Sequence, residues 1–396
     1  MLLATFDVPG DGPTRAIAAF EWARAPSFPL AGGWPPGFLF LSGSFEALVG
    51  EPLLSARILN LVLGSLTVPL LYLLVRRLYD TTAALASGAV LCFVPLHVGL
   101  SASSLTEASF LFELIAGTLL LVGPRPGAER DRFAPWRVAL GVLSLVLASM
   151  TRYEAWPLLP LFVAHRFART RSLRAAAVVA VALAAFPVAW SIGNYLDSGD
   201  PWLGFTAATS YIGITATPAT FGHALQLLAD WSAWQLGWVL PAAIVVGIGW
   251  ELLRAARGGI GVDRWPYLAL TGLQWLVLLR FAMVRGENVW TRYLVSSLVC
   301  ALPFAFVPWS GAARAPSARR AAALAAVAIL GLFAPWLGHL ERAGGHWVTS
   351  RRPVEAEVVV RWLREAGRLD QPILLTPMEW NSPSSCCRHQ RSRGTP

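Results

Sequence analysis

The stretch "ARILNLVLGSLTVPLLYLLVRRLY", residues 56–79, decides the fold class. Apolar and small residues dominate it, no acidic residue interrupts it, and it closes on the pair Arg76 and Arg77. About 20 apolar residues in a helix cross roughly 30 Å of hydrocarbon. We therefore predict a transmembrane helix near 54–75, with the arginine pair holding one end at the cytoplasmic surface.

The composition extends this prediction to the whole chain. Of the 396 residues, 55% are hydrophobic and 14% charged, whereas soluble domains carry about 25% charged residues. The mean hydropathy is +0.54. The fold class predicted is an all-α polytopic membrane protein. About ten transmembrane helices are expected, near 54–75, 81–99, 105–122, 137–151, 154–167, 174–195, 232–252, 265–283, 293–309 and 320–338.

Arginine placement predicts the orientation. The chain has no lysine, and its net charge of +9 comes from arginine. In a soluble protein this charge would suggest nucleic acid, but here it fits loops held at an anionic membrane face, and no nucleic-acid partner is expected. With residues 1–53 outside, the short outer turns that follow this first loop hold only Arg152, Arg285 and Arg292. The inner turns hold sixteen, which satisfies the positive-inside rule: arginines 76, 77, 125, 130, 132, 137, 166, 169, 171, 174, 254, 257, 264, 314, 319 and 320.

This orientation divides the chain into two parts. Residues 1–340 form the transmembrane domain, whose residues 1–53 are its first extracytoplasmic loop. No apolar span precedes that loop, so we expect a first helix to be missing upstream. Residues 341–396 form a short extracytoplasmic tail, in which "PVEAEVVVRWLREAG" predicts a helix and "QPILLT" a strand. We expect this tail to be a truncated α/β fragment.

The candidate site residues gather on the predicted outer turns. They are Asp11 and Arg15 in the first loop, Glu107 in the second outer turn, Arg152, Tyr153 and Glu154 in the third, and Arg292 and Tyr293 in the fifth. Carboxylates and arginines thus meet at one membrane surface beside an apolar body. This combination suits a substrate with an acidic headgroup and a lipid tail.

Each candidate also has a structural interpretation. Asp11 precedes a helical run and could cap it, and Glu107 opens a helix, where a negative charge favours the dipole. Arg152 and Arg292 could pair with their neighbours Glu154 and Glu287. Two further charges fall inside predicted spans, Glu113 in "LFELIAG" and Arg280 in "VLLRFAM". Because charges are costly in hydrocarbon, both are expected to face the bundle interior or a polar cavity.

The order of these features resembles the GT-C glycosyltransferases, and within them the protein mannosyltransferase and aminoarabinose transferase-like group. The resemblance covers about residues 7–340. It consists of the first-loop acid, the return at Pro35 and Pro36, the stretch 56–79, the second-loop acid, "TRYEAW" at 151–156 and "RYL" at 292–294. It departs from the group in the absent first helix and in a single first-loop Asp.

The resemblance implies a function and a role for each site residue. A sugar would move from a polyprenyl-phosphate donor to an acceptor hydroxyl, with inversion, on the extracytoplasmic face of a bacterial plasma membrane. Asp11 and Glu107 would be catalytic, with Glu107 positioning either the acceptor or a divalent cation, Mg²⁺ or Mn²⁺; no metal-ligand residues are assigned. The substrate-binding residues would be Arg15, Arg152, Tyr153, Glu154, Arg292 and Tyr293.

The chemistry is consistent with these roles. Inversion needs one displacement and hence one base for the acceptor proton. The phosphate leaving group needs positive charge, which the arginine fork supplies. Besides the sugar donor and the membrane lipid, the partner would be an acceptor glycan, lipid or protein. The alternatives are a transporter or flippase for a lipid-linked substrate, for which Glu113 and Arg280 would couple ions, and a noncatalytic membrane subunit.

Overall fold

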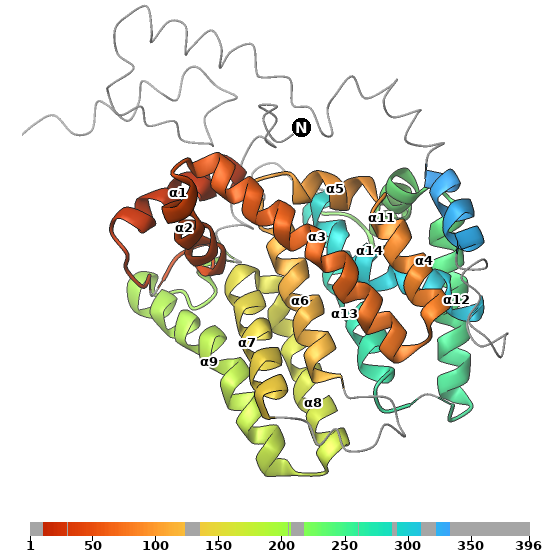
Figure 1. Ribbon diagram of the computed structural model, residues 1–396. Helices are drawn as coiled ribbons and strands as arrows, with labels where there is room; N and C mark the ends of the chain where they lie inside the picture. The colour runs from red at the N-terminus through yellow and green to blue at the C-terminus, as the bar shows by residue number, and fades with distance from the viewer. Residues whose placement is uncertain are drawn as a thin grey trace, which may run out of the picture.

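The computed structural model describes residues 11–29, 31–122, 135–204, 206, 218–259, 261–286, 291–309 and 322–332. Within these ranges every regular element is a helix and no strand occurs, as the predicted fold class requires. Figure 1 shows the helices packed in one bundle, with α1 and α2 gathered at one corner of it. The elements are α1 (Asp11–Arg24), α2 (Gly37–Val49), α3 (Pro52–Leu78), α4 (Thr81–Leu91), α5 (Pro95–Ser101), α6 (Glu107–Leu121), α7 (Pro135–Thr151), η1 (Tyr153–Leu158), α8 (Leu159–Thr170), α9 (Leu173–Ser198), α11 (Phe221–Leu236), α12 (Val239–Ala256), α13 (Trp265–Arg285), η3 (Thr291–Tyr293), α14 (Leu294–Ala301), η4 (Leu302–Ala305) and η5 (Val307–Trp309).

Several of these helices are able to cross a membrane. By length and hydropathy α3, α9, α12 and α13 qualify, which makes four among the described residues. The bent pair α4 and α5 would be a fifth if the two form one span. Shorter apolar helices include α2, α7 and the segments Leu294–Trp309 and Ala322–Leu332. The multi-pass architecture is therefore confirmed, while the count of ten spans stays a prediction.

Helix α3 forms where the opening stretch predicts it, because its ends carry strong signals. The side chain of Glu51 accepts a hydrogen bond from the backbone of Leu54, and Pro52 occupies the first turn. Both features favour a helix start. Arg76 and Arg77 lie in the last turn, where the helix dipole favours positive charge.

Two predicted spans are interrupted in the structure, each at a residue with a physical reason to break a helix. The span predicted near 81–99 bends by 62° between α4 and α5, at Pro95. Proline lacks the N–H that a continuing helix would need. The span predicted near 232–252 is divided between α11 and α12 at Gly237, whose φ is 68°. Positive φ is accessible to glycine at little cost.

The predicted first loop also contains more regular structure than a loop. It forms α1 and α2, which pack on the start of α3 through Ala16, Phe38 and Ala56. Gly43 of α2 lies so close to α1 that a Cβ there would be 2.5 Å from the Trp22 ring. This packing fixes the position of the N-terminal end of α1. The proposed missing first helix and the tail 341–396 lie outside the described residues.

A buried amide ties α3 to the start of α6. Asn60 donates from Nδ2 to the carbonyl oxygens of Ser103, at 2.8 Å, and Leu105, at 2.5 Å. Its Oδ1 accepts a 2.7 Å hydrogen bond from Ser109 Oγ. Because all these groups are buried, each unmade bond would cost free energy. The network holds the first turn of α6, and with it Glu107, against α3.

The two charges predicted inside spans behave differently. Glu113 is 2% exposed and accepts a hydrogen bond from Thr151 Oγ1 at 3.1 Å, so it faces the interior as predicted. The prediction for Arg280 is wrong, because its side chain is exposed on the surface of α13. Arg280 lies about one and a half turns from the end of α13. A long arginine side chain at that depth can extend to the membrane surface instead of facing the bundle.

Candidate functional site

Four separate segments bring the predicted site residues together. Asp11 begins α1, Glu107 begins α6, Arg152 lies between α7 and η1, and Arg292 lies in η3. Ion pairs of Arg292 with Asp11 and Glu107, and of Arg152 with Glu107, hold these four ends together. The charged residues predicted on separate outer turns therefore form one cluster in space.

Arg292 connects the first two acids. It donates from Nη2 to Asp11 Oδ2 at 2.6 Å, and its Nε lies 3.5 Å from Glu107 Oε1. Asp11 and Arg292 are 281 residues apart in the sequence. The pairing of Arg292 with Glu287 that the sequence left open falls on a residue outside the described part of the chain.

Arg152 connects Glu107 to the third acid, Glu154. Its Nη1 lies 2.7 Å from Glu107 Oε1, and its Nη2 lies 2.5 Å from Glu154 Oε1. It also donates from Nη1 to Thr106 Oγ1 at 3.0 Å. The pairing of Arg152 with Glu154 is thus confirmed. Glu107 Oε1 is shared between two guanidinium groups, which links all three acids through two arginines.

Exposure separates the members of this cluster. The side chain of Glu107 is 2% exposed and that of Glu154 14%, whereas that of Asp11 is 33% exposed. Arg292 is buried and Arg152 is nearly so, with side chains 9% and 11% exposed. Asp11 is therefore the most accessible of the three carboxylates. It is the one that an incoming hydroxyl could reach with the least rearrangement.

The charges set the protonation states. Burial by itself would raise the pKa of Asp11, but Arg292, Arg15 and Arg152 outweigh burial and lower it below the usual value of 3.8. Burial by itself would lower the pKa of Arg152, but Glu154 and Glu107 raise it. Arg292 is affected in the same way, with Glu107 as the largest raising influence. At neutral pH Asp11 is therefore a carboxylate and both arginines are charged.

Arg15 is the third arginine near Asp11. Burial lowers its pKa to about 10, which still leaves it protonated at neutral pH, and Asp11 opposes that shift. Its guanidinium lies over the ring of Trp34, 4.2 Å from the centroid. A cation at this distance from an indole is stabilised by the ring quadrupole. Arg152 and Arg292 similarly lie 5.1 and 5.4 Å from the centroid of Tyr293.

Tyr153 belongs to a neighbouring network rather than to the charge cluster. Its hydroxyl accepts a 2.9 Å hydrogen bond from Trp190 Nε1 and contacts the carbonyl oxygen of Gly32 at 3.5 Å. The N–H of Gly32 donates to Asn194 Oδ1 at 2.8 Å. Gly32 has φ +154°, a conformation that L side chains rarely adopt. These contacts tie the loop before Trp34 to the end of α9.

Gly32, Trp190 and Asn194 were not among the residues predicted for the site. The one signal available was the amide of Asn194, which is 1% exposed within an otherwise apolar span. A buried amide needs hydrogen-bond partners, and its partner turned out to be the first loop.

Divalent cation binding has a limited basis in this geometry. Within the described ranges no group of three or more His, Cys, Asp and Glu side chains could hold a metal ion. The two candidate catalytic carboxylates, Asp11 and Glu107, are both engaged by Arg292. A cation bridging them would have to displace this arginine.

Comparison with known proteins agrees with the architecture. Residues 34–192 match the family of dolichyl-phosphate-mannose-protein mannosyltransferases. No curated protein sequence matches the chain. Among solved structures, ArnT from Cupriavidus metallidurans in the apo state superposes with a TM-score of 0.53 and 15% identity, covering 77% of this chain and 56% of that one. The archaeal oligosaccharyltransferase AglB from Archaeoglobus fulgidus, in complex with an inhibitory peptide and a dolichol-phosphate, gives a TM-score of 0.57 and 13% identity.

Both structural matches cover most of this chain but only part of the solved proteins. The AglB comparison covers 92% of this chain but 55% of AglB, so the chain spans little more than half the length of both solved proteins. At this identity the likeness concerns the fold. Residues 34–192 match the mannosyltransferase family, and two solved structures have the same architecture as this chain. The chain therefore has the GT-C glycosyltransferase fold.

Proposed function

We propose that the protein is a membrane glycosyltransferase that moves a sugar from a polyprenyl-phosphate donor to an acceptor hydroxyl on the extracytoplasmic face. The fold supports this proposal, as does a solved ArnT structure bound to undecaprenyl phosphate, with a TM-score of 0.54. The observation that carries it is the pair of Asp11 and Arg292, in which an ionised, accessible carboxylate touches a buried arginine at 2.6 Å. This pair brings a base and a phosphate-binding group to one place.

The proposed step is a single displacement at the anomeric carbon. Asp11 takes the proton of the acceptor hydroxyl, and the acceptor oxygen bonds to the anomeric carbon from the face opposite the phosphate. The bond from that carbon to the phosphate oxygen breaks, its electron pair stays on the polyprenyl phosphate, and the configuration inverts. A phosphate leaving group is already weakly basic, so this step needs one base and no general acid.

The arginines would stabilise the charge that develops on the leaving phosphate. Arg292 is the stronger candidate for this contact, because it already lies against the proposed base. Arg152 is engaged by Glu107, Glu154 and Thr106, which suits a group that orients its neighbours. Preorganised positive charge in a site of low dielectric lowers the barrier more than the same charge in water.

Glu107 would act by positioning. It is almost fully buried between the two guanidinium groups and lies against Arg292 at 3.5 Å. A carboxylate held there keeps the forks of both arginines in a fixed orientation. A role for Mg²⁺ or Mn²⁺ beside it stays a prediction. Loss of transfer on adding a chelator, and recovery on adding either ion, would support that role.

Radiolabelled polyprenyl-phospho-sugars, supplied to membranes that contain the protein, test the proposal. Transfer to endogenous acceptor is measured for the wild type, for Asp11→Asn, and for Asp197→Asn as a control on an exposed carboxylate at the same end of the bundle. We expect Asp11→Asn to abolish transfer at an unchanged protein level. Loss of the folded protein would assign Asp11 to helix capping, and wild-type turnover would remove it as the base.

The same assay addresses the substrate. Hexosyl and pentosyl donors tested side by side identify the sugar, and separation of labelled lipid, glycan and protein identifies the acceptor. The transporter alternative drew on Glu113 and Arg280 inside spans. An exposed Arg280 no longer supports it, and Glu113 has a hydrogen-bonding partner in Thr151. Movement of a labelled lipid across vesicles without sugar transfer would favour the transporter.

A further inference from the structure

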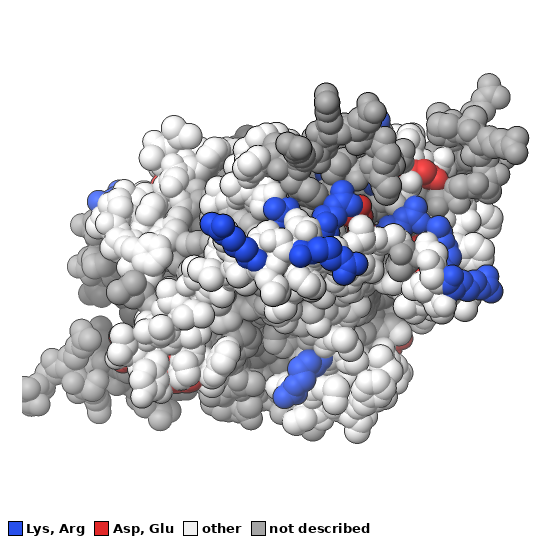
Figure 2. Space-filling model, turned by 90° about the horizontal axis from the view of Figure 1, so that it is seen from below, with Lys and Arg blue, Asp and Glu red and all other residues white. Residues whose placement is uncertain are grey.

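A second charged region lies at the other end of α9 from the candidate site. Arg166 and Arg169 project from α8, Arg171 is in the turn, and Arg174 is in the first turn of α9. Arg174 and Asn194 are about 30 Å apart along α9 at 1.5 Å per residue. Figure 2, which views the bundle from below, shows arginines gathered across this face with few acids among them.

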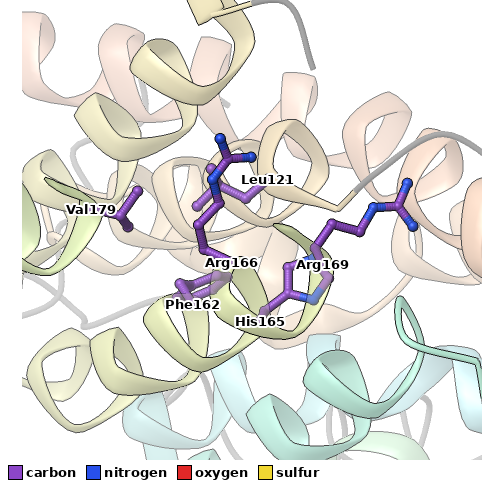
Figure 3. Close-up of a pocket in the computed structure, with 6 residues that line it drawn as sticks. All are labelled: Leu121, Phe162, His165, Arg166, Arg169 and Val179. Atoms are coloured by element: carbon purple, nitrogen blue, oxygen red, sulfur yellow. The ribbon is translucent and has the colours of Figure 1, made fainter. Parts of the chain in front are cut away.

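Arg169 forms an ion pair within the protein. Arg169 Nη1 lies 2.8 Å from Asp263 Oδ2, and His165 Nε2 lies 3.8 Å from the other oxygen of the same carboxylate. Figure 3 shows Arg166 leaving the same helix in a different direction, beside Leu121 and Val179. Arg169 therefore holds α8 against the segment before α13, whereas Arg171 and Arg174 are exposed.

Arg166 and Arg174 line a cavity of about 320 Å³ between α7, α8 and α9. This volume lies in the range of small-molecule sites. Its other lining residues are Val138, Ser172, Ala175, Val178 and Val179. One side of the cavity is therefore cationic and the rest is aliphatic. Val178 is 64% exposed on α9, a helix apolar enough to cross a membrane, so the aliphatic side faces the hydrocarbon.

The start of α9 favours an anion in this cavity. Its first turn carries no acidic residue, although the positive end of a helix dipole favours negative charge there. Arg174 occupies that turn instead, is exposed, and makes no ion pair with the residues that the structure describes. A cation at the positive end of a helix is unfavourable by itself. A bound anion would offset both charges.

We propose that this cavity binds the headgroup of an anionic phospholipid from the membrane leaflet at this face. The phosphodiester would lie between Arg166 and Arg174 near the first turn of α9, and one acyl chain would follow Val138 and Val178. The aliphatic lining favours a lipid over a free anion, and the paired arginines favour an anionic headgroup over a zwitterionic one. This site is separate from the proposed donor site and does not depend on it.

Lipid retention by the purified full chain in native mass spectrometry tests the proposal. The protein is titrated with phosphatidylglycerol or with phosphatidylcholine of the same chain length. We expect the wild type to retain one phosphatidylglycerol at concentrations where phosphatidylcholine is not retained. Arg174→Gln should weaken that retention about tenfold, as for the loss of one charge-assisted contact.

Two further variants make the result specific. Ala175→Glu puts a negative charge in the first turn of α9, where it favours the helix while repelling a phosphate. It should abolish retention of phosphatidylglycerol without lowering the unfolding temperature in phosphatidylcholine. Arg76→Gln and Arg257→Gln remove exposed arginines at the ends of α3 and α12, outside the cavity. Both should retain phosphatidylglycerol as the wild type does.

Three outcomes would overturn the proposal. The first is equal retention of the two lipids by the wild type. The second is wild-type retention of phosphatidylglycerol by both Arg174→Gln and Ala175→Glu. The third is an equal loss in the Arg76→Gln and Arg257→Gln controls, which would indicate attraction by the whole basic face rather than a site.

Discussion

The two ends of α9 use arginine in opposite ways. At the end near Asn194, two arginines, Arg152 and Arg292, contact three carboxylates, Asp11, Glu107 and Glu154, and the contacts are mostly buried. At the other end Arg169 pairs with Asp263, and Arg166 and Arg174 line a cavity. The first arrangement holds each side chain in place. In the second arrangement the exposed Arg174 can contact an anion outside the protein.

The difference follows from the cost of burying charge. A guanidinium taken out of water loses several kcal/mol unless a carboxylate and further hydrogen bonds replace the solvent. Arg152 has two carboxylates and a threonine around it. Arg174 is exposed, so its guanidinium keeps its contact with solvent. Substitutions in the buried cluster should therefore affect turnover and stability together, except at its accessible member.

Asp11→Asn should have the largest effect. Removal of a general base typically costs about 10²- to 10⁴-fold in rate. Because Asp11 is one-third exposed, stability should change little. The measurement is the initial rate of transfer, normalised to folded protein by size-exclusion chromatography. A rate within threefold of the wild type would contradict the role of Asp11 as the base.

Arg292→Ala should have the next largest effect, of about 10- to 150-fold, the equivalent of one charge-assisted contact. Arg292→Lys keeps the charge but loses the two-pronged geometry, so it should be only partly active. Arg152→Ala and Arg152→Lys form the matched series. A loss that appears in kcat, rather than in the dependence on donor concentration, would indicate a contact that strengthens in the transition state.

Normal donor kinetics in both alanine variants would contradict a phosphate site at these arginines. Their role would then be limited to the ion pairs with Asp11, Glu107 and Glu154. The Arg292 and Arg152 variants also test whether the two arginines have different roles. Arg292 lies against the proposed base, whereas Arg152 lies among its neighbours, so Arg292→Ala should be the more damaging in kcat.

Glu107→Gln should weaken transfer less than Asp11→Asn but destabilise the protein more. It leaves Arg152 and Arg292 close together without the carboxylate that both contact. Removing one partner of a buried ion pair costs about 3 kcal/mol or more. The measurement is the thermal unfolding of both variants in the same detergent. A more stable Glu107→Gln than Asp11→Asn would contradict the positioning role.

How much of this could be predicted from the sequence differs between fold and site. Long apolar runs predicted α3, α9 and α13 because a membrane span needs continuous hydrophobicity. The breaks at Pro95 and Gly237 lie inside runs that remain apolar, so hydropathy alone did not reveal them. The exposed Arg280 shows the related limit, because a long side chain near a helix end can reach the surface.

The sequence predicted that the site residues lie on turns at one face of the membrane, but it did not predict which side chains pair with each other. The pairing of Arg152 with Glu154 was weighed because the two are close in sequence. That of Arg292 with Asp11 spans the whole domain and depends on how α1 packs against α3. Local sequence contains no record of such packing. The contact of Asn194 with Gly32 was missed for the same reason.

The pH dependence of transfer should shift when the cluster loses Arg292. In the wild type, burial would raise the pKa of Asp11, but the arginines hold it below 3.8, with Arg292 foremost among them. A base with a lowered pKa stays active until the pH falls through that lowered value. In Arg292→Gln burial remains and the main opposing charge is gone, so the pKa rises. The acid limb of the residual activity should therefore move to higher pH.

The profile of kcat/KM against pH measures this shift, because it reports the free enzyme. Arg166→Gln, on α8 and far from Asp11, provides the control and should leave the acid limb in place. An unchanged limb in Arg292→Gln would mean that Asp11 does not limit the rate at low pH.

Asn194→Ala should have the smallest effect, and it tests whether α9 supports the site through the first loop. Asn194 Oδ1 accepts from the N–H of Gly32, two residues before Trp34, on whose ring Arg15 lies. One neutral hydrogen bond contributes about 1 kcal/mol, so transfer should fall roughly fivefold.

Ser198→Ala removes a hydrogen bond at the same helix end, to the Asn194 carbonyl, and should not change the rate. If Asn194 acts through this loop, Trp34→Ala should lower the rate by itself, and adding Asn194→Ala to it should lower the rate no further. Losses that multiply in the double variant would mean that the two residues act independently and that the loop does not connect α9 to Arg15.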